Sequence, residues 1–331
     1  MLTSKNSFFA SSSLTQGGDV MALADLSRPI SANGASCGFI AFAESEADEL
    51  RLTGRERTAE KYDTVINSYR RFLSGCGDIR IGLVDSALMV AYESYLKDSG
   101  ICLNSISFYM RGLRAIYNRA VDKGAVEQHH PFRHVYTGIS KTVKRAVPVE
   151  VIRKIKDMDL SADLQADFAR DVFMFSFYTR GMSFVDMAFL KKNDLRNGIL
   201  SYCRQKTGQR LFVRWENPMQ EIVDKYDTSS VPYLLPIIRD NYKDARRQYI
   251  SAEHLVNSKL KRIGRSLDLE QPLTTYVARH CWASIARSRN IPIATISEAL
   301  GHDSEKTTRI YLASLDTSLV DNANRLVLEL L

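Results

Sequence analysis

The segment from Thr274 to Leu315 constrains the fold of this chain most strongly. Its apolar residues recur at the three- and four-residue spacing of amphipathic helices: Ala283, Ile285, Ala286, Ile293, Ile296, Ala299 and Leu300. Gly301 stands where a helix C-cap glycine belongs, and Asp303-Ser304 offers N-cap side chains to a following helix. The segment therefore predicts short packed helices whose ends hold three polar side chains: Arg279, His302 and Tyr311.

Each of these three side chains also has a purely structural interpretation. Arg279 could be a solvated charge on a helix face, His302 a residue that interacts with the helix dipole, and Tyr311 a half-buried core aromatic. Taken together, however, the order R-H-x-[WF]-A-S, L-G-H-x-S and T-T-x-x-Y resembles the C-terminal signature of the tyrosine recombinases, the phage-integrase family. Arg279 matches the second arginine of that signature, His302 its Gly-His position and Tyr311 its nucleophile.

The composition suits a soluble protein of two domains with a polyanionic partner. The 331 residues are enough for two hydrophobic cores, and the net charge of +7 is moderately basic. The five cysteines are odd in number and lack metal-ligand spacing, which favours reduced thiols in a cytoplasm. Since no apolar run has the length of a membrane span, we expect a cytoplasmic, nucleoid-associated protein without a membrane partner.

Residues 1–136 predict a tail followed by a helical domain. Residues 1–44 are rich in Ser, Gly and Ala without a sustained period, which is typical of a flexible tail. In residues 45–136, apolar and aromatic residues follow one stripe of each expected helix, so this part predicts a compact helical bundle. The resemblance implies that this bundle is a core-type DNA-binding domain. The last helix of this domain carries Arg111, Arg114 and Arg119. These arginines either form a solvated helix face or contact DNA phosphates.

Residues 137–147 predict a basic connector between two domains. Its cations could follow a phosphate backbone: Lys141, Lys144 and Arg145. Residues 148–315 predict a catalytic domain with helices at 148–158, 161–178, 219–226 and 237–264. Strands at 199–203 and 211–215 predict a β-hairpin with Lys206 at its mouth. The expected fold is mainly α with a small β-hairpin: a helical core-binding domain plus a tyrosine-recombinase-like catalytic domain.

The resemblance implies strand transfer through a 3′-phosphotyrosine. Tyr311 would be the nucleophile, Arg279 would clamp the scissile phosphate with its planar fork, and His302 would donate a hydrogen bond to it. Lys206 would be the general acid that protonates the leaving 5′ oxygen. Because one phosphodiester replaces another, ATP is unnecessary, and the sequence has no glycine-rich phosphate loop or carboxylate cluster. We therefore expect no metal and no cofactor.

Two positions depart from the family's pattern. The first arginine of the family lies in a G-[LM]-R-x-x-[ED] context, whereas this chain has Ser183 in that place. We expect Arg180, three residues earlier, to supply the missing cation. The usual H-x-x-R begins with Tyr276 here. Because a phenol with a pKa of about 10 is a poor base at neutral pH, His280 on nearly the same helix face is the alternative.

We therefore expect a site-specific recombinase that acts on double-stranded DNA as a homotetramer on two sites. Integration, excision of a mobile element and inversion use the same chemistry, so the sequence does not choose among them. Residues 1–44 do not look like a folded arm-binding domain, which favours a simple recombinase with core sites only, such as an invertase or resolvase. Residues 316–331 predict a tail helix that docks on its own domain or on a neighbouring protomer. The alternatives are a catalytically silent DNA-binding regulator and a type IB topoisomerase-like nicking-closing enzyme.

Overall fold

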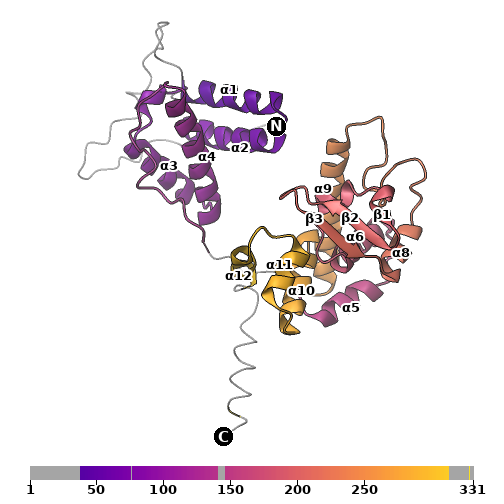
Figure 1. The fold of residues 1–331 in the computed structure, drawn as a ribbon. Helices are drawn as coiled ribbons and strands as arrows, with labels where there is room; N and C mark the ends of the chain where they lie inside the picture. Colours follow the sequence, from indigo (N-terminus) through magenta and orange to yellow (C-terminus); the bar gives the residue numbers. More distant parts are fainter. Residues whose placement is uncertain (1–37, 76, 141–145, 313–327, 329–331) are drawn as a thin grey trace, which may run out of the picture. The chain divides into compact units, whose positions relative to one another are not determined.

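The computed structural model describes residues 38–75, 77–140, 146–312 and 328, and for Ile310 and Tyr311 it describes the backbone alone. The chain divides into two compact units, Met1–Ser140 and Lys141–Leu331 (Figure 1). This division falls inside the connector predicted at 137–147. Each unit has its own hydrophobic core, so the two are described separately.

The first unit is a bundle of α-helices around aromatic side chains. Its elements are α1 (Phe39–Leu52), α2 (Glu56–Phe72), the 3₁₀ turn η2 (Ile81–Leu83), α3 (Ser86–Asp98) and α4 (Leu103–Asp122). Tyr69 lies at the centre, edge-on to Phe39 and Tyr92 at 5.8 and 5.1 Å between ring centroids. Gly112 lets α4 approach α2 closely, because a Cβ at that position would lie 2.5 Å from Val65.

The expected tail over residues 1–44 was too long. Residues 39–44 belong to α1, and Phe39, Ile40 and Ala43 are buried in the core of the bundle. The carboxylate of Asp78 caps the helix by accepting hydrogen bonds from Ile40 N at 2.8 Å and Ala41 N at 3.0 Å. Because this cap comes from a residue 38 positions away, no local start signal marks the helix. Residues 1–37 lie outside the described range.

A buried ion cluster joins α1 to α4. Glu46 is 1 % exposed and accepts hydrogen bonds from Arg119 and Lys123. Lys123 also donates to Glu49 at 2.7 Å. Burial raises the pKa of Glu46, but the hydrogen bonds from Lys123 and Arg119 outweigh this and leave the pKa below its ordinary value. The carboxylate is therefore stable in its charged form only with these partners.

The second unit combines helices with a small sheet. Its elements are α5 (Val149–Asp157), α6 (Leu164–Tyr178), α7 (Phe184–Ala188), the 3₁₀ turn η3 (Lys192–Asp194), β1 (Leu195–Arg196), β2 (Ile199–Cys203), β3 (Arg210–Arg214), α8 (Asn217–Asp224), α9 (Ala245–Ser266), α10 (Thr275–Ser288), α11 (Ile293–Leu300) and α12 (Glu305–Leu312). The central helix is α6, which contacts α5, α8, α9 and α10 and buries Phe173 and Phe175 completely. A helix packed on several sides is apolar nearly all round, and residues 172–178 of α6 are apolar except for Ser176.

The sheet is antiparallel in the order β1-β2-β3. In the hairpin, Ile199 pairs with Arg214 and Cys203 with Arg210. Leu200 and Tyr202 face the core, and the alternating residues are turned outward. The fold is thus mainly α with a small β-hairpin, as predicted, extended by the short strand β1.

The helix predicted over 237–264 was wrong at its start. α9 begins at Ala245, where Asp244 caps it by accepting a hydrogen bond from Arg246 N at 2.8 Å. Ile237 and Ile238 precede it in a loop and are buried, at 4 % and 1 % exposure. These two apolar residues extended the predicted helical stripe towards the N-terminus. They are buried because the loop packs against the core of the unit, not because they belong to the helix.

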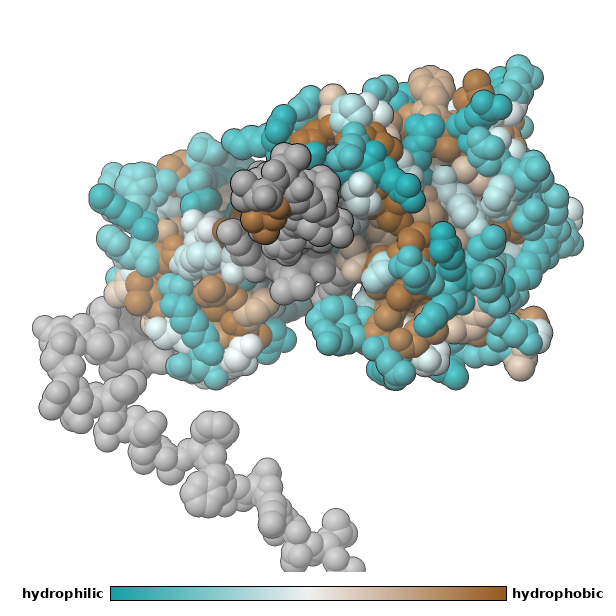
Figure 2. All heavy atoms as spheres, turned by 90° about the horizontal axis from the view of Figure 1, so that it is seen from below, coloured by the Kyte–Doolittle hydropathy of each residue, from teal (hydrophilic) through white to brown (hydrophobic). Residues whose placement is uncertain are grey.

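Figure 2 shows the hydropathy of one face of the molecule. Hydrophilic side chains cover most of that face, with smaller apolar areas between them. Within the part of the chain that the structure describes, no helix is long and apolar enough to span a bilayer.

Candidate active site

Arg279 is buried on α10 and held by carbonyl groups of two other segments. The side chain is 3 % exposed. Its Nη1 donates to Gly181 O at 2.9 Å and its Nη2 to Leu300 O. Leu300 is the last residue of α11, so the guanidinium group lies at the negative end of that helix. These contacts fix the planar fork before any ligand is present.

A sharp turn after α6 brings the backbone against Arg279. Arg180 and Gly181 both have positive φ, 62° and 78°. A Cβ on Gly181 would lie 2.6 Å from the Cα of Arg279, so only glycine fits this approach. The Arg180 side chain is half-buried and donates from Nη1 to Phe212 O at 3.2 Å.

His302 follows the αL residue that ends α11. Gly301 has φ 61°, as the predicted C-cap requires. The His302 Nδ1 lies 2.8 Å from the hydroxyl of Thr308, a fully buried residue of α12. Burial, followed by the positive charges of Arg279, Arg204 and Lys206, lowers the pKa of His302 to about 4. The imidazole is therefore neutral at physiological pH.

The β2–β3 hairpin carries two cations into this region. Arg204 N donates to Gln209 O at 2.8 Å and Gly208 N to Arg204 O at 2.8 Å, which closes the turn. Lys206 is exposed on the turn. Arg204 is 7 % exposed and donates from Nη1 to Gly301 O. Both charges are near enough to His302 to lower its pKa.

The hydroxyl of Ser183 is bound within the protein. Ser183 Oγ donates to Asp186 Oδ2 at 2.6 Å, at the start of α7. The other oxygen of Asp186 accepts from Gln205 N at 2.8 Å, on the hairpin turn. Asp186 is 4 % exposed. This buried carboxylate therefore links the place of the family's first arginine to the segment that carries Lys206.

Tyr276 and His280 form a contacting pair on α10. Their rings are perpendicular, with centroids 4.7 Å apart. Tyr276 is 53 % exposed, whereas His280 is 6 % exposed. The exposed phenol is thus the member of the pair that faces solvent, and the imidazole is packed beneath it.

The remaining predicted residues fall into different places. Tyr311 lies on α12, and the structure describes its backbone alone. Arg111 and Arg114 are exposed on α4, whereas Arg119 is tied to Glu46. The connector cations Lys141, Lys144 and Arg145, and all of the tail 316–331 except Leu328, lie outside the described residues. The structure therefore brings together Arg279, His302, Lys206, Arg180 and Ser183 around the ends of α6, α11 and the hairpin.

Sequence reasoning missed residues that support this cluster. Asp186 was visible as the acidic residue three positions after Ser183, a capping pattern at a helix start. Thr308 was visible only as a member of T-T-x-x-Y. Arg204 gave no signal, because an arginine at the end of a strand is normally solvated.

The cluster is suited to binding a phosphate diester. Arg279 and Arg204 are buried cations, and His302 is a neutral group that can donate a hydrogen bond. Buried positive charge favours an anionic ligand, and fixed donors stabilise charge that grows on phosphate oxygens in a transition state.

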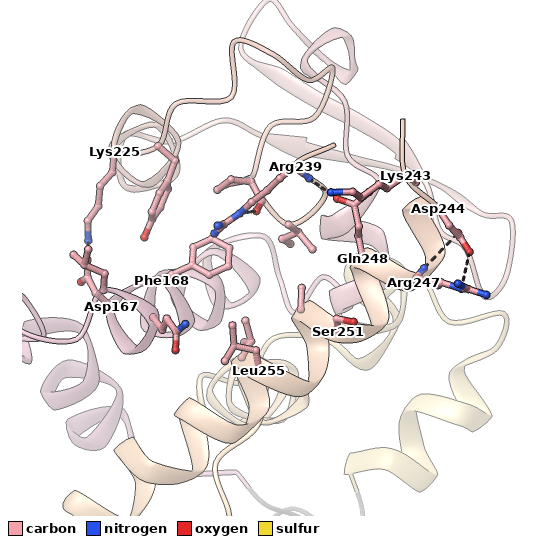
Figure 3. A pocket seen from close by; sticks show the side chains of 17 residues that line it. Asp167, Phe168, Lys225, Arg239, Lys243, Asp244, Arg247, Gln248, Ser251 and Leu255 are labelled. Carbon is pink, nitrogen blue, oxygen red and sulfur yellow. Dashed lines mark hydrogen bonds and ion pairs between the residues drawn. The ribbon is translucent and has the colours of Figure 1, made fainter. Parts of the chain in front are cut away.

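A separate cavity of about 890 Å³ lies between α6 and α9 (Figure 3). Phe168 and Leu255 contribute to its mainly apolar lining, and Arg239 lies over the Phe168 ring at 5.8 Å. At its edge Lys225 is paired with Asp167. No predicted site residue lines this cavity, so it is distinct from the cluster around Arg279 and His302.

Two family models match the chain. The phage integrase SAM-like domain matches residues 38–136, and the phage integrase family model matches residues 216–318. The second match contains Arg279, His302 and Tyr311. Tyrosine recombinase XerC of Pediococcus pentosaceus is 24 % identical over 77 % of this chain and 87 % of its own length. Tyrosine recombinase XerA of Pyrococcus furiosus is 25 % identical over 65 % of this chain and 72 % of its own.

Solved structures share the fold at lower identity. A lambda integrase dimer bound to a COC′ core site has a TM-score of 0.64 at 16 % identity, covering 84 % of this chain and 96 % of that chain. The Tn1549 transposon integrase in complex with a circular intermediate DNA has a TM-score of 0.63 at 14 % identity, covering 89 % and 100 %. The matched domains and the curated relatives place this chain in the phage integrase family of tyrosine recombinases, which are site-specific DNA strand-exchange enzymes.

Proposed function

We propose that this recombinase cuts and rejoins double-stranded DNA through Tyr311, with a 3′-phosphotyrosine as the intermediate. The phenol oxygen bonds to the scissile phosphorus as its proton passes to solvent, and the bond from phosphorus to the 5′ oxygen breaks. Lys206 gives that oxygen a proton as the general acid. A 5′ hydroxyl of the partner strand then reverses the reaction and releases the tyrosine, so the number of phosphodiester bonds is conserved.

The observation that carries the proposal is the convergence of Arg279, His302 and Lys206 at the C-terminal end of α11. Arg279 holds the non-bridging oxygens as negative charge shifts onto them. In the tautomer in which Thr308 donates to Nδ1, the N–H of His302 is on Nε2 and can donate to the phosphate. The helix α12 that carries Tyr311 follows directly, and Thr308 on that helix fixes His302.

Four further residues complete the candidate site. Arg180 is the sequence-based candidate for the missing first cation, and Ser183 occupies the place of that arginine. Tyr276 and His280 occupy the place of the family's histidine as a contacting pair. The buried His280 is better placed to orient its neighbour than to meet DNA directly, whereas the exposed Tyr276 is accessible to a ligand.

The test is covalent capture of the intermediate. A duplex with inverted repeats taken from beside the gene, nicked next to the expected cleavage position, is incubated with the protein and run on a denaturing gel. The wild type should give a protein–DNA adduct that Tyr311→Phe abolishes, while binding of the intact duplex is unchanged. An adduct that persists in Tyr311→Phe would remove Tyr311 from the mechanism.

The assembly follows from the chemistry of exchange. We assign the exposed arginines of α4, Arg111 and Arg114, and the connector cations to DNA phosphates, and the tail 316–331 to docking between protomers. A lambda integrase tetramer bound to a Holliday junction has the same fold as this chain, with a TM-score of 0.65 at 17 % identity, over 85 % of this chain and 78 % of that chain. This likeness supports a homotetramer on two sites. We assign the reaction to the cytoplasm, on nucleoid DNA, and to a simple invertase or resolvase that acts on core sites only.

The two alternative functions are not favoured. The named relatives are recombinases, and neither a silent regulator nor a type IB topoisomerase is among them. The adduct assay separates the enzyme from a regulator. Relaxation of a plasmid without any recombination site would separate the topoisomerase from the recombinase.

A further inference from the structure

The place of the family's first arginine lacks a cation in this chain. Ser183 stands there, and its hydroxyl is bound to Asp186 at 2.6 Å. The same carboxylate also accepts from Gln205 N, so each of its oxygens already has a partner within the protein. Phosphoryl transfer through a charged transition state needs more than one donor on the non-bridging oxygens. A second cation must therefore come from another element of the fold.

Arg204 is a buried arginine whose bonding capacity is largely unused. It is 7 % exposed, and among the described residues it makes one side-chain hydrogen bond, from Nη1 to Gly301 O. Its buried Nε has no hydrogen-bond partner there. Guanidinium carries five N–H donors, and burying such a charge without an anion is costly. The side chain is thus arranged for a ligand that the protein itself does not supply.

The anchors of Arg204 and Arg279 are adjacent in the chain. Arg204 donates to Gly301 O and Arg279 to Leu300 O, the carbonyls at the end of α11, and His302 is the next residue. Packing fixes Arg204 further, since a Cβ on Gly301 would lie 3.2 Å from the Arg204 Cδ. Two buried guanidinium groups are therefore held beside the imidazole that we assign to the phosphate.

We propose that Arg204 binds the scissile phosphate and takes the role that the family gives to the arginine at the Ser183 position. The proposal rests on the strand-transfer function above. The planar fork contacts a non-bridging oxygen opposite Arg279, and its anchorage to Gly301 sets its orientation. The catalytic cation has thus moved from the start of α7 to the end of β2.

Arg180 fits this role less well. Its left-handed backbone directs the side chain to Phe212 O, on the strand β3, where its Nη1 is bound at 3.2 Å. Arg204 is bound to the carbonyl of Gly301, the residue directly before His302, whereas the bond of Arg180 is to a strand residue. The sequence-based expectation for Arg180 therefore competes directly with Arg204.

The test uses duplexes that differ only at the scissile phosphate. One carries the ordinary diester and the other a methylphosphonate, in which a methyl group replaces one non-bridging oxygen and removes its negative charge. The nicked duplex is mixed with full-length wild type, Arg204→Ala, Arg204→Lys, Arg180→Ala and Arg214→Ala, and adduct formation is timed. Arg214 is the matched control, because it is an exposed arginine at the far end of the same hairpin.

Arg204→Ala should slow adduct formation on the ordinary diester by about 10²–10³-fold, as loss of one transition-state donor does. On the methylphosphonate duplex, Arg204→Ala should react within about tenfold of the wild-type rate on that same duplex, because the negative charge that Arg204 would stabilise has been removed. Arg204→Lys should fall between them, since lysine keeps the charge but loses the fork. Arg214→Ala should stay within about threefold of the wild type on both duplexes. Any loss in Arg180→Ala should be smaller than that of Arg204→Ala and the same on both duplexes.

The control for folding is the melting temperature of each variant. Equal losses for Arg204→Ala on both duplexes would make Arg204 a structural anchor of the hairpin and overturn the proposal. If Arg204→Ala does not fold, Arg204→Lys decides by the same comparison. A selective loss in Arg180→Ala with methylphosphonate rescue would also overturn it. Absence of an adduct with the wild type would instead refute the proposed function itself.

Discussion

Replacing Gly181 by alanine should disable the site through Arg279 without touching any catalytic side chain. A Cβ at Gly181 would lie 2.6 Å from the Arg279 Cα, whereas ordinary contact begins at 3.4 Å, so the two segments must part by about 0.8 Å. The neighbour is backbone and cannot rotate away. Gly181 O also accepts from Arg279 Nη1, so the displacement moves the guanidinium group with its anchor. A misplacement of about 1 Å costs roughly 10²-fold in rate.

Gly198→Ala is the control for backbone strain. Gly198 has φ 72°, close to the 78° of Gly181, but a Cβ there meets nothing within 4 Å. An L-residue in this region costs about 1 kcal/mol, so both variants should lose a few degrees of melting temperature. Gly181→Ala should lose somewhat more, because crowding of packed atoms adds about 1–3 kcal/mol.

The assay is the rate of adduct formation on the nicked duplex, measured well below both melting temperatures. Gly181→Ala should be about 10²-fold slower than Gly198→Ala, with DNA binding retained. Rates within threefold of each other would refute the reasoning, because they would show that the approach of Gly181 does not position Arg279.

Three further outcomes test other parts of the molecule. Lys206→Ala should slow cleavage of ordinary DNA far more than cleavage of a 5′-thio substrate, whose leaving group needs no acid; equal losses would exclude the acid role. Glu46→Gln should cost about 2 kcal/mol of unfolding free energy. The pKa of Glu46 is lower in the folded state than in the unfolded state. The difference in unfolding free energy between wild type and variant should therefore be complete above the unfolded-state pKa and disappear as the pH falls through the folded-state pKa. A difference that does not depend on pH would contradict the pairing of Glu46 with Arg119 and Lys123. Neutralising the connector should reduce the salt slope of DNA binding by about one unit per lost contact, and an unchanged slope would place these residues away from DNA: Lys141, Lys144 and Arg145.

Local signals in the sequence predicted the elements that local chemistry determines. Gly301 ends α11 in the left-handed region, because a glycine follows an apolar helical stripe. The β2–β3 hairpin follows from alternation around a turn that contains Gly208 at φ 71°. Where a start depends on a distant partner, prediction failed. α1 is capped by Asp78, and nothing near Phe39 announces that cap.

The site was predictable to the same extent. Arg279 and His302 were found because family motifs and helix ends coincide. Arg204 was not, because its burial depends on a carbonyl 97 positions away and on packing that brings the hairpin against α11. Ser183 is an intermediate case. Its partner Asp186 is only three residues away, so that contact could be predicted from the sequence. The hydrogen bond from Gln205 N to the same Asp186 is a tertiary contact that the sequence does not indicate.

The attachment of the hairpin has a consequence for control. Arg204 and Lys206 are two residues apart on one turn, which is held by Gly301 O and by Asp186. Any movement that releases these two anchors would withdraw the proposed phosphate clamp and the proposed proton donor in the same step. Within an assembly, the position of this one turn would switch phosphate binding and proton donation on or off together in each subunit.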